Sequence, residues 1–137
     1  MSRINDKIEE IEKSLDMLNS FTPKDFDEYS KDEKTKAACE HFFEKIIEAL
    51  ADLAFLCIKD MRLVLPKDDV EAFVVLAKNG LISVTLAERL REAKGMRNII
   101  SHEYGKVDDE LVFDAITNEI PRDAREFIDL INKKFGN

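Results

Sequence analysis

The spacing of apolar residues most constrains the fold of this 137-residue chain, because it is helical along almost the whole sequence. Near the N-terminus, large aliphatic residues recur in steps of four and three, which places them on one face of an α-helix: Ile4, Ile8, Ile11, Leu15 and Leu18. The same spacing returns in later segments, from Ser30 to Leu65, Val70 to Ala77, Ser83 to Gly105 and Asp108 to Phe135. We therefore expect an all-α, up-and-down bundle of about five helices.

Capping residues predict where these helices begin and end. Thr22 and Pro23 fit the cap and the first position of a short helical turn. Ser30-Lys31-Asp32-Glu33 matches the capping box S-x-x-E, so the longest helix should begin there and continue to Leu65-Pro66. The remaining signals are two caps, a left-handed helix end, and a proline that kinks or restarts a helix: Ser83, Asp108, Asn79-Gly80 and Pro121.

Length and composition indicate one domain that spans residues 1–137. An apolar content of 45% excludes a disordered tail. Cys39 and Cys57 fall far apart on one predicted helix, which favours two small buried hydrophobes over a disulfide. The N-terminus lacks an apolar signal region, and no apolar run approaches the ~20 residues of a membrane span. We expect a cytoplasmic protein without a membrane partner.

Common cofactor and metal motifs are missing from the sequence. It contains no phosphate-binding loop, no dinucleotide-binding glycine pattern, no H-E-x-x-H and no C-x-x-C. Glu44, Glu48 and Asp52 share one helix face by their four-residue spacing. With only two histidines in the chain, a solvated acidic face is favoured there over a metal site. We expect neither a metal nor a cofactor of its own.

The segment from Lys94 to Gly105 concentrates side chains that can do chemistry at the end of a predicted helix. Asn98 and His102 are four residues apart and share a face, so the amide can orient the imidazole. Arg97 and His102 lie about 140° apart around the helix and would flank a groove. The adjacent stripe continues from Arg97 through Ser101 and Tyr104.

These side chains suit cleavage of RNA without a metal. Histidine can transfer protons near neutral pH, and arginine presents a permanently charged fork to phosphate oxygens. The 2′-hydroxyl would attack the adjacent phosphorus, with His102 moving protons and Arg97 stabilising the pentavalent charge. A two-fold dimer would supply a second set of both residues, and close helix approach there would explain Gly95. The alternative is that Arg97 and His102 only cap a helix end.

The net charge limits how strongly, and over how much of its surface, the chain is expected to bind a nucleic acid. The formal charge of -8 argues against a broad basic footprint. Residues 88–106, however, hold two more basic than acidic side chains. We expect weak, salt-sensitive binding of RNA confined to a locally positive cleft, and no binding of DNA.

The octet from Arg97 to Tyr104 resembles the signature R-x4-H-x-Y of HepT-like toxins in the HEPN superfamily, with Asn98 after the arginine. The resemblance implies a HEPN-like helical dimer and a metal-independent ribonuclease that arrests translation. Arg97 and His102 would be catalytic, and Asn98 and Ser101 would support them. It also implies a partner antitoxin, a minimal nucleotidyltransferase of the MntA type. This partner would use ATP and Mg²⁺ to attach AMP to Tyr104 and so block the cleft.

Two other interpretations stay open from the sequence. The chain could be a non-catalytic module that binds a nucleotide or pairs with the nucleotidyltransferase as a scaffold. It could also be a structural helical dimer in which Arg97 and His102 satisfy helix-end carbonyls.

Overall fold

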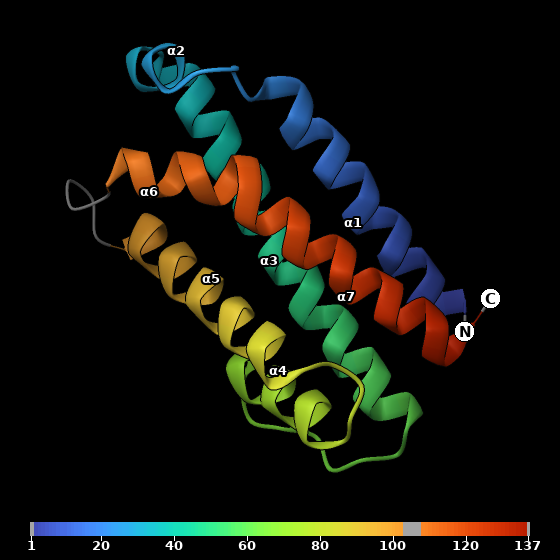
Figure 1. The fold of residues 1–137 in the computed structure, drawn as a ribbon. Coiled ribbons are helices and arrows are strands. Elements are labelled where there is room, and N and C mark those ends of the chain that lie inside the picture. Colours follow the sequence, from blue (N-terminus) through green and yellow to red (C-terminus); the bar gives the residue numbers. More distant parts are fainter. Residues whose placement is uncertain (1, 103–107, 137) are drawn as a thin grey trace.

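Four helical rods run alternately up and down the molecule (Figure 1). The computed structural model describes residues 2–102 and 108–136, without the side chains of Ser2, Ser101 and His102. The rods are α1 (Ser2–Phe21), α3 (Glu33–Asp60), α5 (Val84–His102) and a continuous helical rod made of α6 (Asp109–Asp114), the π-helical turn η1 (Ala115–Glu119) and α7 (Ile120–Phe135). Within these residues, two shorter helices connect the rods: α2 (Phe26–Lys31) and α4 (Asp69–Lys78). The all-α, up-and-down prediction is confirmed.

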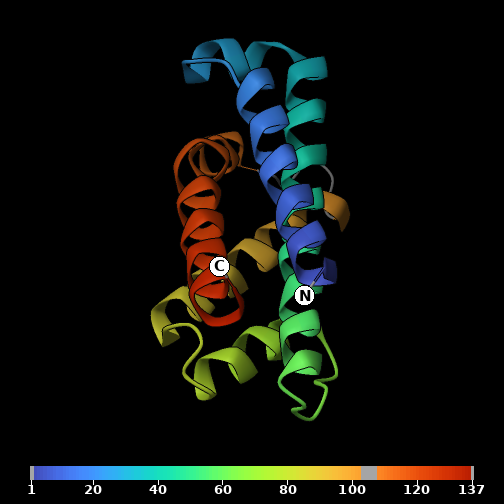
Figure 2. The ribbon, with the colours of Figure 1, turned by 90° about the vertical axis from the view of Figure 1, so that its right-hand side faces the viewer.

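Helix α3 is the central element of the bundle. It contacts α1, α4, α5 and α7, and Figures 1 and 2 both show α1 packed along it. The predicted stripe of α1 faces this helix, since Ile11 is fully buried and Leu18 is 1% exposed. Cys39 and Cys57 are also fully buried on α3, as expected for small hydrophobes. Burial raises the pKa of the Cys57 thiol to about 12, so it is protonated at neutral pH.

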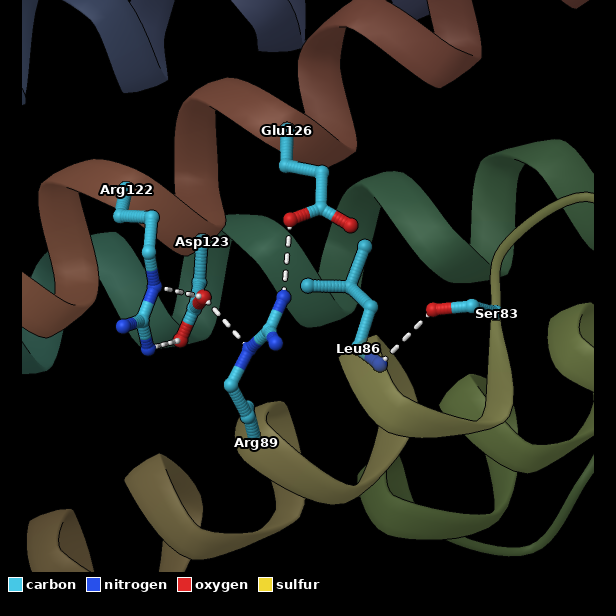
Figure 3. A network of polar contacts seen from close by, with 6 residues as sticks. All are labelled: Ser83, Leu86, Arg89, Arg122, Asp123 and Glu126. Carbon is cyan, nitrogen blue, oxygen red and sulfur yellow. Dashed lines mark hydrogen bonds and ion pairs between the residues drawn. The ribbon is translucent and has the colours of Figure 1, made fainter.

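Several predicted caps are present. The Ser83 hydroxyl accepts a hydrogen bond from the Leu86 amide at 3.0 Å, before the first turn of α5 (Figure 3). Asp108 caps α6 by accepting from the amides of Glu110 and Leu111. Gly80 follows α4 with φ +77°, a left-handed conformation that few side chains tolerate.

The start of α2 differs from the prediction. The Thr22 hydroxyl donates to the Leu18 carbonyl at 2.6 Å, so it closes the end of α1 and caps no new helix. Pro23 lies outside the helices. The N-cap of α2 is Asp25, whose carboxylate accepts from the Glu28 amide at 2.9 Å.

Both ends of the longest helix also differ from the prediction. Ser30 belongs to α2, and the N-cap of α3 is Asp32, which accepts from the amides of Lys34 and Thr35. The aspartate of the apparent capping box therefore caps the helix in place of the serine. At the other end α3 ends at Asp60, because Arg62 adopts a left-handed conformation with φ 58°. The apolar residues up to Leu65 lie in the following loop.

The rod of α6 and α7 bends through a π-helical turn. Pro121 lies in the first turn of α7, directly after this turn, where its missing N–H is tolerated. The chain thus stays helical through Pro121, where a kink or a restart was predicted. Among residues 2–102 and 108–136, no helix has the length and apolar character needed to cross a membrane.

Candidate active site on helix α5

Helix α5 is anchored to α7 through a network of charged side chains (Figure 3). The Arg89 guanidinium donates from Nε to Asp123 Oδ1 at 2.9 Å and from Nη2 to Glu126 Oε1 at 2.8 Å. Arg122 Nε donates to the same oxygen, Asp123 Oδ1, also at 2.9 Å. The Asp123 side chain is only 3% exposed, so its charge is balanced inside the bundle. This network fixes the first half of the helix that carries the motif.

A second ion pair joins α5 to α4, where Lys94 Nζ lies 2.7 Å from Asp69 Oδ2. Together with Arg89 and Arg97, Lys94 is paired with carboxylates from other elements. The excess positive charge predicted for residues 88–106 is therefore largely neutralised within the chain. A count along the sequence missed these carboxylates because they come from distant segments.

Arg97 occupies an unusual place on α5. The buried face of this helix runs through Leu86 and Leu90, and the same steps of four and three lead through Ala93 to Arg97. Its side chain is 21% exposed and its Nη2 forms a hydrogen bond and ion pair with Glu48 Oε1 on α3. The Arg97 Nε is buried without a hydrogen-bond partner among the described atoms. An arginine thus takes the position where the core stripe would place an apolar residue.

The other predicted site residues are placed only in part. Asn98 follows Arg97 on α5 and is exposed. Ser101 and His102 belong to α5, but their side chains lie outside the described atoms. Tyr104 lies outside the described residues. The predicted sharing of a face by Asn98 and His102 therefore remains a prediction from helical spacing.

Charged side chains also gather where the chain enters α6. Lys36 Nζ on α3 lies 2.7 Å from Asp109 Oδ2, and this bond raises the pKa of the lysine. Glu40, one turn further along α3, is half-buried. Burial raises the pKa of its carboxyl, and nearby Asp109 raises it further.

An apolar groove of about 380 Å³ lies between α5 and the start of α6. Ile99 is 40% exposed and Leu111 is 59% exposed along it, and Gly95 lies in its wall. Beyond its chain neighbours and the nearby backbone of α5, a Cβ atom at Gly95 would meet no described atom within 4 Å. Packing within the described part of one chain therefore does not explain this glycine. In residues 2–102 and 108–136, no group of three or more metal-ligating side chains gathers at this groove or elsewhere.

Comparison with known proteins decides the family. The sequence model described as "Ribonuclease HepT-like" matches residues 11–131, which include all of the motif. The chain belongs to the HepT-like ribonuclease family. The resemblance seen in the octet from Arg97 to Tyr104 is thereby confirmed at the level of the family.

Two curated HepT-like relatives are nucleases. The mRNA nuclease HepT of Shewanella oneidensis is 30% identical over 88 residues, which are 64% of this chain and 65% of that protein. The tRNA nuclease HepT of Aphanizomenon flos-aquae is 27% identical over 114 residues, which are 83% of this chain and 78% of that protein.

A solved structure supports both the HepT-like fold and the occurrence of such proteins in toxin–antitoxin complexes. The tri-AMPylated Shewanella oneidensis HEPN toxin in complex with MNT antitoxin superposes with a TM-score of 0.88 and 25% identity. The match covers 95% of this chain and 96% of that chain. A toxin–antitoxin structure with AMP-PNP has the same fold, with a TM-score of 0.89 and 23% identity. The chain is thus a HEPN protein of a toxin–antitoxin nuclease family.

Sequence reasoning about the HepT-like motif missed Glu48 as a partner of Arg97. The stripe of Glu44, Glu48 and Asp52 was interpreted as a solvated acidic face. Glu48 and Asp52 are indeed 54% and 61% exposed, but each forms an ion pair with a neighbouring helix, Asp52 with Lys7 of α1. The available signal was the arginine itself, because an arginine on a buried stripe needs a carboxylate nearby.

Proposed function

We propose that this protein is the toxin of a toxin–antitoxin pair and cleaves RNA without a metal. The observation that carries the proposal is the intact R-x4-H-x-Y motif, Arg97 to Tyr104, in a HepT-like chain whose α5 ends at His102. The nuclease names of two relatives support the reaction class. The proposed site of action is the cytoplasm, where mRNA and tRNA are available.

The chemistry follows from the two motif side chains. His102 removes the proton of a ribose 2′-hydroxyl, whose oxygen then forms a bond to the adjacent phosphorus. The bond from phosphorus to the 5′-oxygen breaks, and this oxygen receives a proton from a second histidine or from water. Arg97 stabilises the negative charge on the phosphoryl oxygens, and Asn98 and Ser101 support the two residues. The products are a 2′,3′-cyclic phosphate and a 5′-hydroxyl.

A homodimer would place two motifs in one cleft. The groove beside α5 supports this arrangement, because Ile99 and Leu111 expose apolar surface there and Gly95 leaves room for a close helix. In the dimer His102 of one protomer acts as base and the partner's His102 as acid.

Neutralisation of the toxin would occur at Tyr104. A nucleotidyltransferase antitoxin, using its own ATP and Mg²⁺, transfers AMP to the tyrosine oxygen and releases pyrophosphate. The AMPylated state of the Shewanella toxin complex supports this step. The bound nucleotide adds negative charge two residues from His102, which repels substrate phosphates.

Cleavage of labelled RNA in EDTA tests the proposal. Wild-type protein should cleave, while Arg97→Ala and His102→Ala should lose cleavage and keep the helical circular dichroism spectrum. His41→Ala is the matched control, because His41 is the other histidine of the chain and is exposed on α3. Cleavage by folded His102→Ala protein would contradict the proposal. Absence of cleavage by the wild type, with AMP still transferred, would favour a non-catalytic module that pairs with the transferase.

A further inference from the structure

The ion pair between Arg97 and Glu48 crosses between two rods of the bundle. Arg97 comes from α5 and Glu48 from the middle of α3, forty-nine positions earlier in the chain. The pair forms at the point where the buried stripe of α5, after Leu86 and Leu90, reaches the acidic stripe of α3. The contact therefore fixes a side chain of the motif relative to the central helix.

The geometry of the pair indicates that Glu48 orients the Arg97 guanidinium without occupying its whole fork. A guanidinium has five N–H groups, and Glu48 engages the Nη2 group. The Arg97 Nε is buried, so the base of the guanidinium is enclosed by the bundle, and Glu48 holds one corner of the fork. The second nitrogen of the fork, Nη1, has no bond to Glu48. The contact orients the fork and leaves a donor edge for a phosphate.

We propose that Glu48 is a positioning residue for RNA cleavage, which holds the Arg97 guanidinium in the orientation that contacts the phosphoryl group. This inference rests on the proposed function of Arg97. Glu48 itself touches neither substrate nor reacting atoms. Its carboxylate replaces one hydrogen-bond partner that a free guanidinium would take from water, so less rotation must be frozen when the transition state forms.

The pair should affect the chemical step more than substrate binding. Removing Glu48 frees the fork but also removes a negative charge near the RNA backbone. For Glu48→Ala we expect kcat to fall about tenfold to a hundredfold, the cost typical of a misplaced catalytic group. The affinity for an uncleavable 2′-deoxy oligonucleotide should stay equal or increase. Glu48→Gln keeps a carbonyl oxygen that can accept from Nη2, so it should restore part of kcat.

Asp52→Ala provides a matched control for these variants. Asp52 lies one turn further along the same stripe and pairs with Lys7 of α1, away from α5. Its removal changes the charge of the stripe by the same amount but leaves Arg97 held. We expect wild-type kcat for this variant, and thermal unfolding of each protein reports whether the fold is kept.

Nuclear magnetic resonance of the Arg97 guanidinium gives a readout that is independent of activity. The Nη–Hη signals, assigned by their loss in Arg97→Lys, should be resolved in the wild type, because the hydrogen bond slows rotation. They should average in Glu48→Ala and be intermediate in Glu48→Gln. Averaged signals in the wild type would overturn the inference.

The cleavage assays then separate the inference from the proposed function. Glu48→Ala protein that cleaves as fast as the wild type, or faster, would refute the inference while Arg97→Ala and His102→Ala uphold the nuclease proposal. A rate lost equally in Asp52→Ala would also refute it. A wild-type protein that does not cleave RNA overturns both.

Discussion

Arg89 Nε lies 2.9 Å from Asp123 Oδ1, and this bond ties the helix of the motif to α7 through a carboxylate that is 3% exposed. The same guanidinium reaches Glu126, so one arginine holds two acids on successive turns of one face of α7 (Figure 3). The position of α5, and with it that of Arg97, depends on this contact.

Arg89→Ala should destabilise the protein by about 2 kcal/mol. The loss stays below the range of about 3–5 kcal/mol for a fully buried pair, because Arg89 is 29% exposed and Arg122 still donates to Asp123. Urea unfolding followed by circular dichroism measures it as a lower midpoint at constant slope. Arg122→Ala, which removes a 54% exposed partner of the same acid, should cost less than half as much. Equal losses for the two variants would show that the bond from Arg89 to Asp123 contributes no more to stability than the bond from Arg122.

Only one of the two tyrosines should accept AMP. Tyr29 is fully buried, and burial raises the pKa of its hydroxyl, so it is a poor nucleophile. After incubation with the partner transferase and ATP, mass spectrometry should find AMP-sized increments on wild-type and Tyr29→Phe proteins and none on Tyr104→Phe. An increment that survives in Tyr104→Phe would contradict the proposed modification site.

Tyr29→Phe should also stabilise the fold. The Tyr29 hydroxyl is buried without a hydrogen-bond partner in the described part of the chain. The centroid of its ring lies 5.1 Å from that of the Phe113 ring. Removing an unsatisfied buried hydroxyl should add about 1 kcal/mol to the free energy of unfolding. Chemical denaturation checks this, and an unchanged or lower midpoint would indicate that the hydroxyl is satisfied by water.

The fold was largely predictable because its helices are determined by short-range features of the sequence, namely apolar spacing and capping residues. Apolar spacing placed Leu18 and Ile11 in the core, and short polar side chains at Ser83 and Asp108 capped the helices they precede. The ends of α3 were missed because neighbouring signals compete. Asp32 lies inside the apparent box that starts at Ser30, and the stop after Asp60 depends on Arg62, which carries no sequence signal for a left-handed conformation.

The candidate site was predictable only along one helix. The placement of Arg97 and Asn98 on one helix could be predicted from the sequence, and both residues lie in α5. The pairing of Arg97 with Glu48 could not, because it joins residues that only tertiary packing brings together. The same limit explains why the positive charge counted along residues 88–106 is neutralised by acids from three other helices.

Glu40→Gln should stabilise the protein at neutral pH and lose this effect in acid. Burial and Asp109 raise the pKa of Glu40 in the folded state, so the fold binds a proton more readily than the unfolded chain does. Stability from this group is therefore present below the unfolded pKa and falls as pH rises through the folded pKa. Denaturation at neutral pH and below about pH 4 measures the difference. A gain of equal size at both pH values would refute the assignment to Glu40.

Leu111→Lys should convert the proposed homodimer into monomers and abolish RNA cleavage. Leu111 is 59% exposed in the groove beside α5, so a lysine there leaves the monomer folded but puts a charge into the proposed apolar contact. Light scattering after size exclusion gives the mass, and the EDTA cleavage assay gives the activity. Val64→Lys is the control, because Val64 is 89% exposed on the loop after α3, away from the groove, and should keep both properties. A Leu111→Lys protein that remains dimeric and active would place the dimer contact on another face of the bundle.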